Sequence, residues 1–150
     1  MKLEITILGC GSSSGVPAIG NNWGSCNPNN PKNRRLRASI LVRSKESTII
    51  VDATPDLRQQ LLNANVKALD AVFITHTHSD HAASIVHFRN KPWIIGSKEF
   101  DDMVAIEGKE IVDAKKSMMG EIIEISDDNE TKIMENVYAI TTPGHTNGHI

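Results

Sequence analysis

The stretch HTHSDH places His76, His78, Asp80 and His81 within six consecutive positions. In an extended segment, side chains two positions apart point to the same side, so His76 and His78 can face one ion. Asp80 and His81 follow where the chain is expected to turn into a helix, and they can face the same cavity from another wall. Imidazole and carboxylate ligands suit zinc, iron or manganese. A polar surface loop is the alternative, but this order after an apolar run predicts a metal site.

A second histidine segment, ITTPGHTNGHI, covers residues 140–150. It also follows an apolar run, and a Pro-Gly turn just before His145 lets that imidazole project from the strand end into a cavity. We expect His145 to supply a third nitrogen ligand. His149 comes four residues later, and we expect it to support the ligands or the fold without binding the ion itself.

The elements that must position these residues follow an alternating pattern. Apolar alternation or short apolar runs predict strands, and turn residues separate them. Expected strands cover residues 3–9, 37–44, 47–53, 68–75, 92–97, 121–126 and 136–142, with an acidic turn at 127–130. Expected helices cover residues 56–66 and 80–90, and residues 97–120 are partly helical. This alternation indicates the α/β class, in which sites gather beyond the carboxyl ends of strands.

Composition restricts the classes of partner. The chain has 150 residues, which suits one domain, and a net charge of −2, which predicts no general attraction to nucleic acid or to an anionic membrane. No apolar run is long enough to span a membrane, and no signal peptide pattern is present. Cys10 and Cys26 are expected to be free thiols, so we expect a cytoplasmic protein.

Three motifs together resemble the metallo-β-lactamase superfamily. They are VDA at 51–53, THTHSDHA at 75–82 and TPGHTNGH at 142–149. The resemblance implies an αββα sandwich with a metal site at one edge. It also implies roles for the residues: His76, His78 and His145 would bind a first ion, Asp80 and His81 would contribute to a second, and Asp52 would be a supporting carboxylate. The implied cofactor is one or two Zn²⁺ ions, with Mn²⁺ or Fe²⁺ as alternatives.

The resemblance also bears on the reaction. ILGCGSSSGVP, WGSCNPNNPKNRR and VDATPDLRQQLL are similar to a phosphodiesterase-like branch, whereas TPGHTNGH is similar to the glyoxalase II thioesterases. We therefore expect hydrolysis of a small or nucleotide-like phosphodiester by a zinc-activated hydroxide, with Asp80 orienting the water or accepting its proton. The alternatives are a thioester hydrolase and a non-catalytic metal-binding half-domain.

Two further expectations concern the substrate and the extent of the fold. Arg34, Arg35 and Arg37 form a basic stretch that could contact phosphate, or could be a solvated loop. The resemblance places two further metal ligands beyond the PGH segment, whereas the sequence ends at Ile150. Residues 1–150 would then be the N-terminal portion of one such domain. Three alternatives stay open: a fragment, a homodimer in which a second copy completes the fold, or a site for a single ion.

Overall fold

The structure is a computed structural model that describes residues 2–126 and 130–150. Its centre is a six-stranded sheet in the order β1-β2-β3-β4-β5-β6. The strands are β1 (Glu4–Gly9), β2 (Ser39–Arg43), β3 (Thr48–Val51), β4 (Ala71–Ile74), β5 (Trp93–Gly96) and β6 (Ile122–Ile125). The first three pair antiparallel, and β3 to β6 run parallel. The carboxyl ends of β3 to β6 therefore meet at one edge of the sheet.

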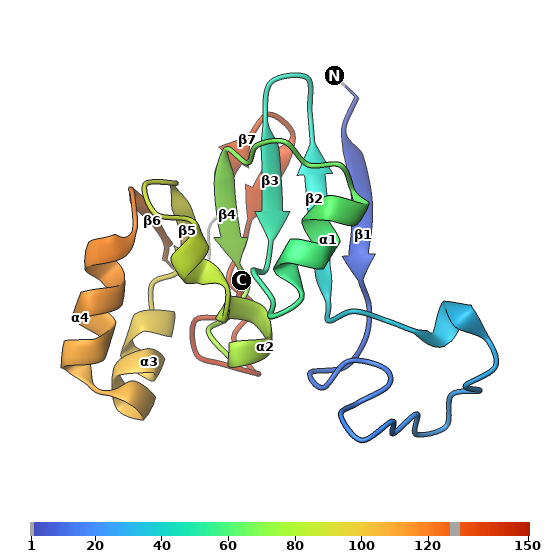
Figure 1. Cartoon of the computed structure of the whole chain (residues 1–150). Coiled ribbons are helices and arrows are strands. Elements are labelled where there is room, and N and C mark those ends of the chain that lie inside the picture. Colours follow the sequence, from blue (N-terminus) through green and yellow to red (C-terminus); the bar gives the residue numbers. More distant parts are fainter. Residues whose placement is uncertain (1, 127–129) are drawn as a thin grey trace.

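Helices cover one face of this sheet, and a β-hairpin covers part of the other (Figure 1). The helices are α1 (Leu57–Asn63), α2 (Ser79–Ala82), α3 (Glu99–Glu107) and α4 (Lys109–Met118), with short 3-10 helices at Pro31–Asn33 and Ile85–His87. The hairpin consists of β7 (Thr131–Met134) and β8 (Val137–Ala139). This mixed α/β arrangement agrees with the fold class that the sequence predicts.

Side-chain alternation along the strands separates two apolar clusters. Leu41, Ile50 and Val72 point to the helical face, where they join Leu57 and Phe100 in the main core. This follows from the period of two along a strand, which sends alternate side chains to opposite faces. On the other face, a smaller cluster contains the buried residues Ile94, Ile125 and Ala139, with Phe73 and Ile133 packed against it.

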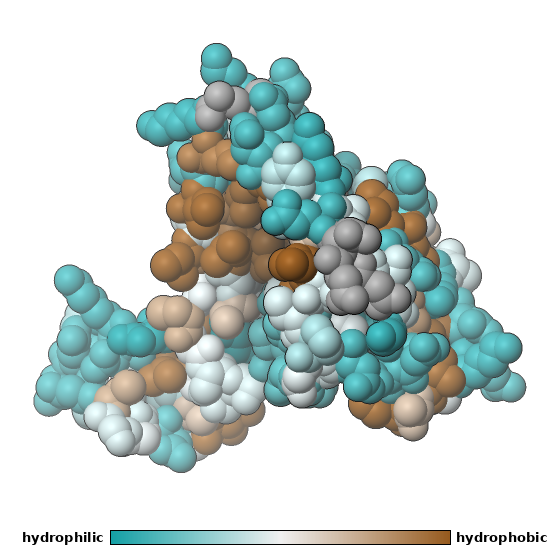
Figure 2. Space-filling model, turned by 180° about the vertical axis from the view of Figure 1, so that it is seen from behind, coloured by the Kyte–Doolittle hydropathy of each residue, from teal (hydrophilic) through white to brown (hydrophobic). Residues whose placement is uncertain are grey.

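The second face is covered only in part by the described residues. A groove of about 420 Å³ runs between the hairpin and the β1–β3 side of the sheet, and its lining includes Ile5, Val42, Ile49, Phe73 and Tyr138. Figure 2 shows this apolar surface from behind. Ile5 is 65% exposed although it lies in a strand, which marks the open side of the sheet.

The expected helix over residues 80–90 is wrong in extent. The α-helix covers a single turn, Ser79–Ala82, and a separate 3-10 helix follows at Ile85–His87. The Ser84 amide donates to the Ala53 carbonyl at 2.8 Å, and the Ser84 hydroxyl donates to the Thr54 carbonyl at 2.6 Å. Because Ser84 bonds to the segment after β3, its amide cannot continue the helical ladder.

The region after β6 also differs from the expectation. β7 was not predicted, and the expected strand over 136–142 is shorter, because β8 ends at Ala139. The expected acidic turn at 127–130 lies largely outside the described residues. Among the described residues, no helix has both the length and the apolarity that a membrane span requires.

Candidate metal centre

The histidine loop leaves the carboxyl end of β4. Thr75 follows the strand directly, His76 is buried, and His78 is the residue just before α2. The segment after β8 reaches the same edge, where the Ile150 amide donates to the Thr75 carbonyl at 3.1 Å. Residues that are far apart in sequence are therefore held side by side at the end of a parallel strand, where sites of α/β folds gather.

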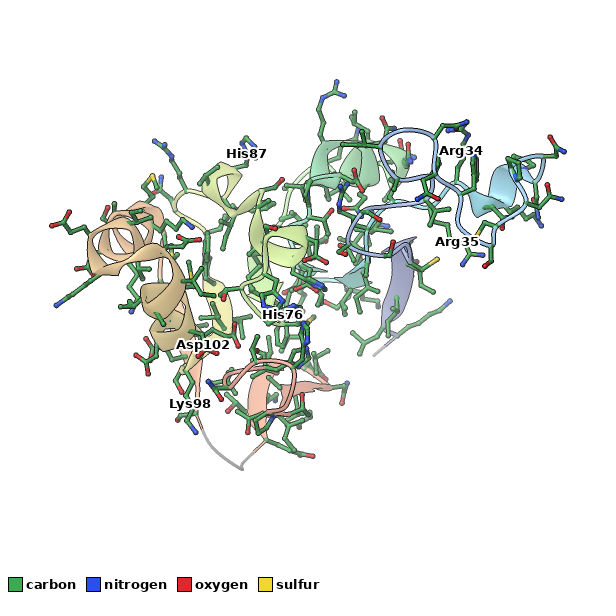
Figure 3. All side chains as sticks on the ribbon, turned by 90° about the horizontal axis from the view of Figure 1, so that it is seen from below. Arg34, Arg35, His76, His87, Lys98 and Asp102 are labelled. Carbon is green, nitrogen blue, oxygen red and sulfur yellow. The ribbon has the colours of Figure 1, made fainter. Side chains whose placement is uncertain are left out.

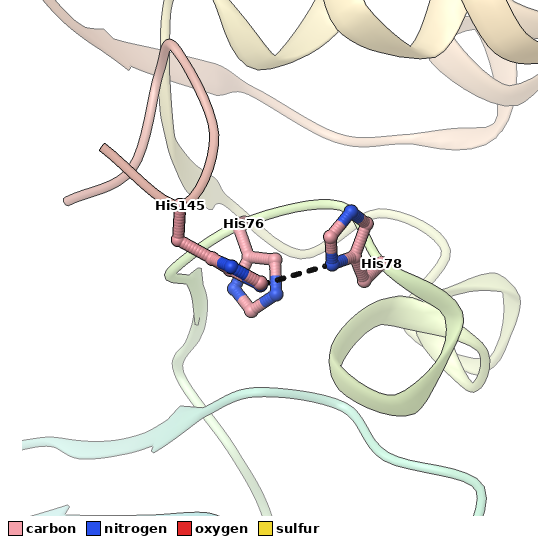
Figure 4. Close-up of side chains that lie close together, drawn as sticks. All are labelled: His76, His78 and His145. Atoms are coloured by element: carbon pink, nitrogen blue, oxygen red, sulfur yellow. Dashed lines mark hydrogen bonds between the residues drawn. The ribbon is translucent and has the colours of Figure 1, made fainter. Parts of the chain in front are cut away.

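Three histidines converge at this edge (Figure 4). His76, His78 and His145 each offer a ring nitrogen, and these three atoms all lie within 4.8 Å of one another. His145 Nε2 is 3.1 Å from His78 Nδ1, although the two residues are 67 positions apart. Three imidazole nitrogens on one centre match the usual protein ligand set of a catalytic zinc ion.

The Nε2 atom of His76 tests whether a metal ion fits here. His76 is 3% exposed, and its Nε2 has no hydrogen-bond partner among the described residues. A buried polar atom without a partner costs free energy, so such atoms usually have a ligand. The unpaired nitrogen lies within the histidine group, and the donor set therefore fits a divalent metal ion.

Hydrogen bonding on the far side of the His76 ring fixes its tautomer. The Thr75 hydroxyl lies 3.0 Å from both carboxylate oxygens of Asp52, and an ionised carboxylate only accepts, so the hydroxyl donates its proton there. His76 Nδ1 is 3.1 Å from the same hydroxyl oxygen and must therefore be the donor. This arrangement leaves the lone pair on Nε2, the atom that faces the other histidines.

Asp52 also orients His81. His81 Nδ1 donates to Asp52 Oδ2 at 2.6 Å, and its Nε2 lies 3.4 Å from Asp80 Oδ2. The hydrogen bond to Asp52 raises the pKa of His81 above 6.5, although burial opposes it. Asp52 itself has a left-handed backbone with φ of 66°, and its amide donates to the Phe73 carbonyl at 2.8 Å. A single buried carboxylate thus contacts both halves of the histidine loop.

The charge environment keeps His76 neutral. Burial, and then repulsion from four neighbouring imidazoles, lowers the pKa of His76 from 6.5 to about 3. Those neighbours are His81, His78, His145 and His149. A neutral imidazole with a free lone pair is the form that binds a metal.

The other predicted residues lie at different distances from this centre. His149 is outside the group of three: its ring stacks on His76 at 5.2 Å between centroids, and its Nδ1 lies 3.1 Å from the Thr142 hydroxyl. Arg34 and Arg35 lie on the long loop far from His76 (Figure 3). Arg37 pairs with Asp56 at 3.0 Å, so the structure does not bring the three arginines to the histidine group.

Sequence reasoning missed the acidic residues that support the centre from α3. Glu99 and Asp102 lie one turn apart on that helix and contact the loops that carry the histidines. Both are acidic residues in the first turn of a helix after a parallel strand. That position places them at the same sheet edge as the histidines, so their place in the sequence was the feature from which they could have been predicted.

A small cavity opens beside the histidine group. It has a volume of about 280 Å³ and is lined by residues that include Thr77, His78, Asp102, Ile106, His145 and Asn147. Two of the three clustered histidines therefore form part of its wall. A small polar molecule in this cavity would lie next to any ion held there.

Comparison with protein families gives one match over most of the chain. The profile described as the metallo-beta-lactamase superfamily matches residues 33–150. A probable metallo-hydrolase of Methanocaldococcus jannaschii is 31% identical over 124 residues, which are 75% of this chain and 59% of that protein. An octanoyltransferase of Porphyromonas gingivalis is 38% identical over 92 residues, which are 61% of this chain and 19% of that protein. The chain thus spans less than two thirds of the length of either relative.

Solved structures share the fold. A diphosphatase from the PhnP family matches with a TM-score of 0.71 and 26% identity, over 88% of this chain and 54% of that one. The zinc-bound PqqB of Methylobacterium extorquens matches with a TM-score of 0.62 and 19% identity, over 89% of this chain and 49% of that one. In both cases the chain corresponds to about half of the matched structure.

Proposed function

The chain belongs to the metallo-beta-lactamase superfamily, and on that premise we propose that it is part of a metal-dependent hydrolase acting on a phosphodiester. The observation that carries the proposal is the unpaired, buried Nε2 of His76 within reach of two further histidines. A buried nitrogen without a partner destabilises the folded protein, and a bound metal ion would remove that cost. The superfamily consists mostly of metal-dependent hydrolases, which supports the same reading.

The proposed ligands come from the histidine loop after β4 and from the segment after β8. His76, His78 and His145 would hold a first divalent ion, for which Zn²⁺ is the best candidate and Mn²⁺ or Fe²⁺ are alternatives. Asp80 and His81 are the candidate ligands of a second. When bound, such an ion supplies a Lewis acid and makes a neighbouring water acidic enough to react near neutral pH.

The chain's own residues would prepare the reaction. Asp52 and Thr75 hold the His76 ring with its Nε2 lone pair free, and Asp52 orients the His81 ring through Nδ1. Asp80 would orient the attacking water and accept its proton. The cavity of about 280 Å³ beside His78 and His145 would hold the substrate against the centre.

The choice of a phosphodiester rests on the N-terminal motifs that resemble a phosphodiesterase-like branch. The 26% identity to a diphosphatase from the PhnP family supports hydrolysis at phosphorus more generally. Thioester hydrolysis is the second candidate, because the PGHTNGH segment resembles the glyoxalase II type. A metal-binding part without activity is the third. Arg34, Arg35 and Arg37 remain a predicted substrate contact, for which the long loop would have to move toward the histidines.

Parallel assays separate these candidates. We expect the zinc- or manganese-loaded chain to hydrolyse bis-p-nitrophenyl phosphate, and the chelator-treated chain to be inactive. His78→Ala should abolish turnover, whereas His87→Ala should keep it, because His87 is exposed and points away from the centre (Figure 3). Turnover of a thioester alone would favour the second candidate. A loaded chain that hydrolyses neither compound would exclude both enzyme proposals for this chain.

A further inference from the structure

Glu99 is a buried carboxylate at the first position of α3, directly after the β5 edge of the sheet. Its side chain is 0% exposed. A buried acid of this kind is stable only when strong donors surround it. The start of a helix helps, because its free amides and dipole favour negative charge.

The donors that surround Glu99 come from two separate loops. Glu99 Oε2 accepts from the Thr77 amide at 2.7 Å and from the Thr77 hydroxyl at 3.0 Å. Glu99 Oε1 accepts from the Thr146 hydroxyl. Thr77 lies between His76 and His78, and Thr146 follows His145. One carboxylate therefore contacts a residue adjacent to each of the three clustered histidines.

The same face of α3 holds the second loop at two more points. Asp102, one turn after Glu99, accepts from the Asn147 amide at 3.1 Å and from its side-chain amide at 2.8 Å. Gly148 packs so closely that a Cβ there would lie 2.4 Å from the Glu99 amide nitrogen. The loop that carries His145 is thus shaped against this helix.

We propose that Glu99 is a positioning residue for the metal centre, whose carboxylate fixes the His145 loop against the His76–His78 loop so that the three imidazoles meet. This inference rests on the proposed function, because it requires that the histidines bind a metal. Without the Glu99 carboxylate, the hydrogen bonds from the Thr77 amide and the Thr146 hydroxyl would lose their common acceptor. The His145 imidazole would then sample more positions, and binding would have to order it.

The test measures metal affinity, not turnover. The dissociation constant for Co²⁺ is determined by competition with a chromophoric chelator, and the visible spectrum of the Co²⁺ complex reports ligand geometry. For Glu99→Gln we expect affinity to fall by about 10- to 100-fold, as for other outer-shell partners of metal ligands, and the spectrum to change. Asp101→Asn is the matched control, because it removes an exposed carboxylate from the same helical turn.

A second pair of variants covers the case in which Glu99→Gln does not fold. Thr146→Val keeps the shape of the side chain but removes the hydroxyl that donates to Glu99, whereas Thr146→Ser keeps the hydroxyl. We expect Val to weaken Co²⁺ binding and Ser to restore it at similar thermal stability. Equal affinity in wild type, Thr146→Val and any folded Glu99→Gln would overturn the inference while leaving the metal centre intact. A wild-type chain that binds no Co²⁺ would overturn the proposed function and this inference together.

Discussion

At the scale of single residues, two groups determine the centre: the Asp52 carboxylate and the Nε2 atom of His76. Asp52 accepts hydrogen bonds from Thr75 and His81, and the arrangement around Thr75 leaves the Nε2 lone pair of His76 free. The cost is concentrated on His76, whose Nε2 is buried without a partner. Preorganisation of this kind lowers the stability of the metal-free protein and favours binding.

The depressed pKa of His76 predicts how the metal-free protein responds to acid. The folded state keeps His76 neutral down to a pKa of about 3, whereas the unfolded chain takes up a proton near pH 6.5. Between these values the unfolded state binds more protons, so the free energy of unfolding falls as the pH falls, by up to about 1.4 kcal/mol per unit from this group. His81 acts in the opposite sense, because its raised pKa stabilises the folded state at low pH and loses that effect as the pH rises.

Urea unfolding of the chelator-treated protein at pH 6.5 and pH 5 measures this effect. The loss of stability between the two values should be smaller in His76→Ala than in wild type. His87→Ala should behave like wild type, because that residue lies away from the cluster. An equal loss in wild type and His76→Ala would show that His76 is not held neutral.

At the scale of elements, the position of the His145 segment depends on close backbone packing. A Cβ at Gly96 in β5 would lie 1.7 Å from the Gly148 carbonyl oxygen, and a Cβ at Gly148 would lie 2.4 Å from the Glu99 amide nitrogen. Both positions therefore need glycine, because any side chain would clash with the neighbouring backbone. This contact holds residues 143–150 against β5 and the first turn of α3. Helix α2 is limited to one turn by another backbone contact, the hydrogen bond from the Ser84 amide to the Ala53 carbonyl after β3.

Gly148→Ala should therefore disturb the centre from outside it. The added methyl would displace the His145 segment, and we expect a loss of about 1–3 kcal/mol in unfolding free energy together with weaker zinc binding. Thermal unfolding and zinc titration of the same samples measure both effects. Gly24→Ala serves as control, because a Cβ there meets nothing within 4 Å, although its φ of 54° adds some backbone strain. Unchanged zinc binding in Gly148→Ala would show that this contact does not position His145.

At the scale of the whole molecule, the sequence predicted the local patterns well and the long-range contacts poorly. The α/β alternation and the strand before HTHSDH were readable, because each rests on periodicity within a few residues. The grouping of His76 and His78 with His145 was predictable as well, because both histidine segments follow apolar runs, and the motif resemblance implies the same three ligands. Glu99 was missed because SKEFDD is typical of any acidic helix start, and its partners lie 22 and 47 positions away. The sequence leaves Arg37 open between a phosphate contact and a solvated loop, because it does not show that the fold pairs this residue with Asp56.

The open face of the sheet is the other large-scale feature. The chain corresponds to about half of the PhnP-family diphosphatase and of PqqB, and the apolar groove on this face agrees with that partial coverage. Association of two copies through this face stays a prediction. This association would complete the fold. It would not be needed to bring the three clustered histidines together, because all three belong to one chain.

The most direct test of the account is the metal content of the intact protein by native mass spectrometry after exposure to Zn²⁺ and buffer exchange. With three histidines as ligands, we expect about one zinc ion per chain in wild type and in His87→Ala. His76→Ala should retain none, because it removes the buried nitrogen around which the site is built. Less than about half an equivalent in wild type, or equal retention in wild type and His76→Ala, would contradict the account.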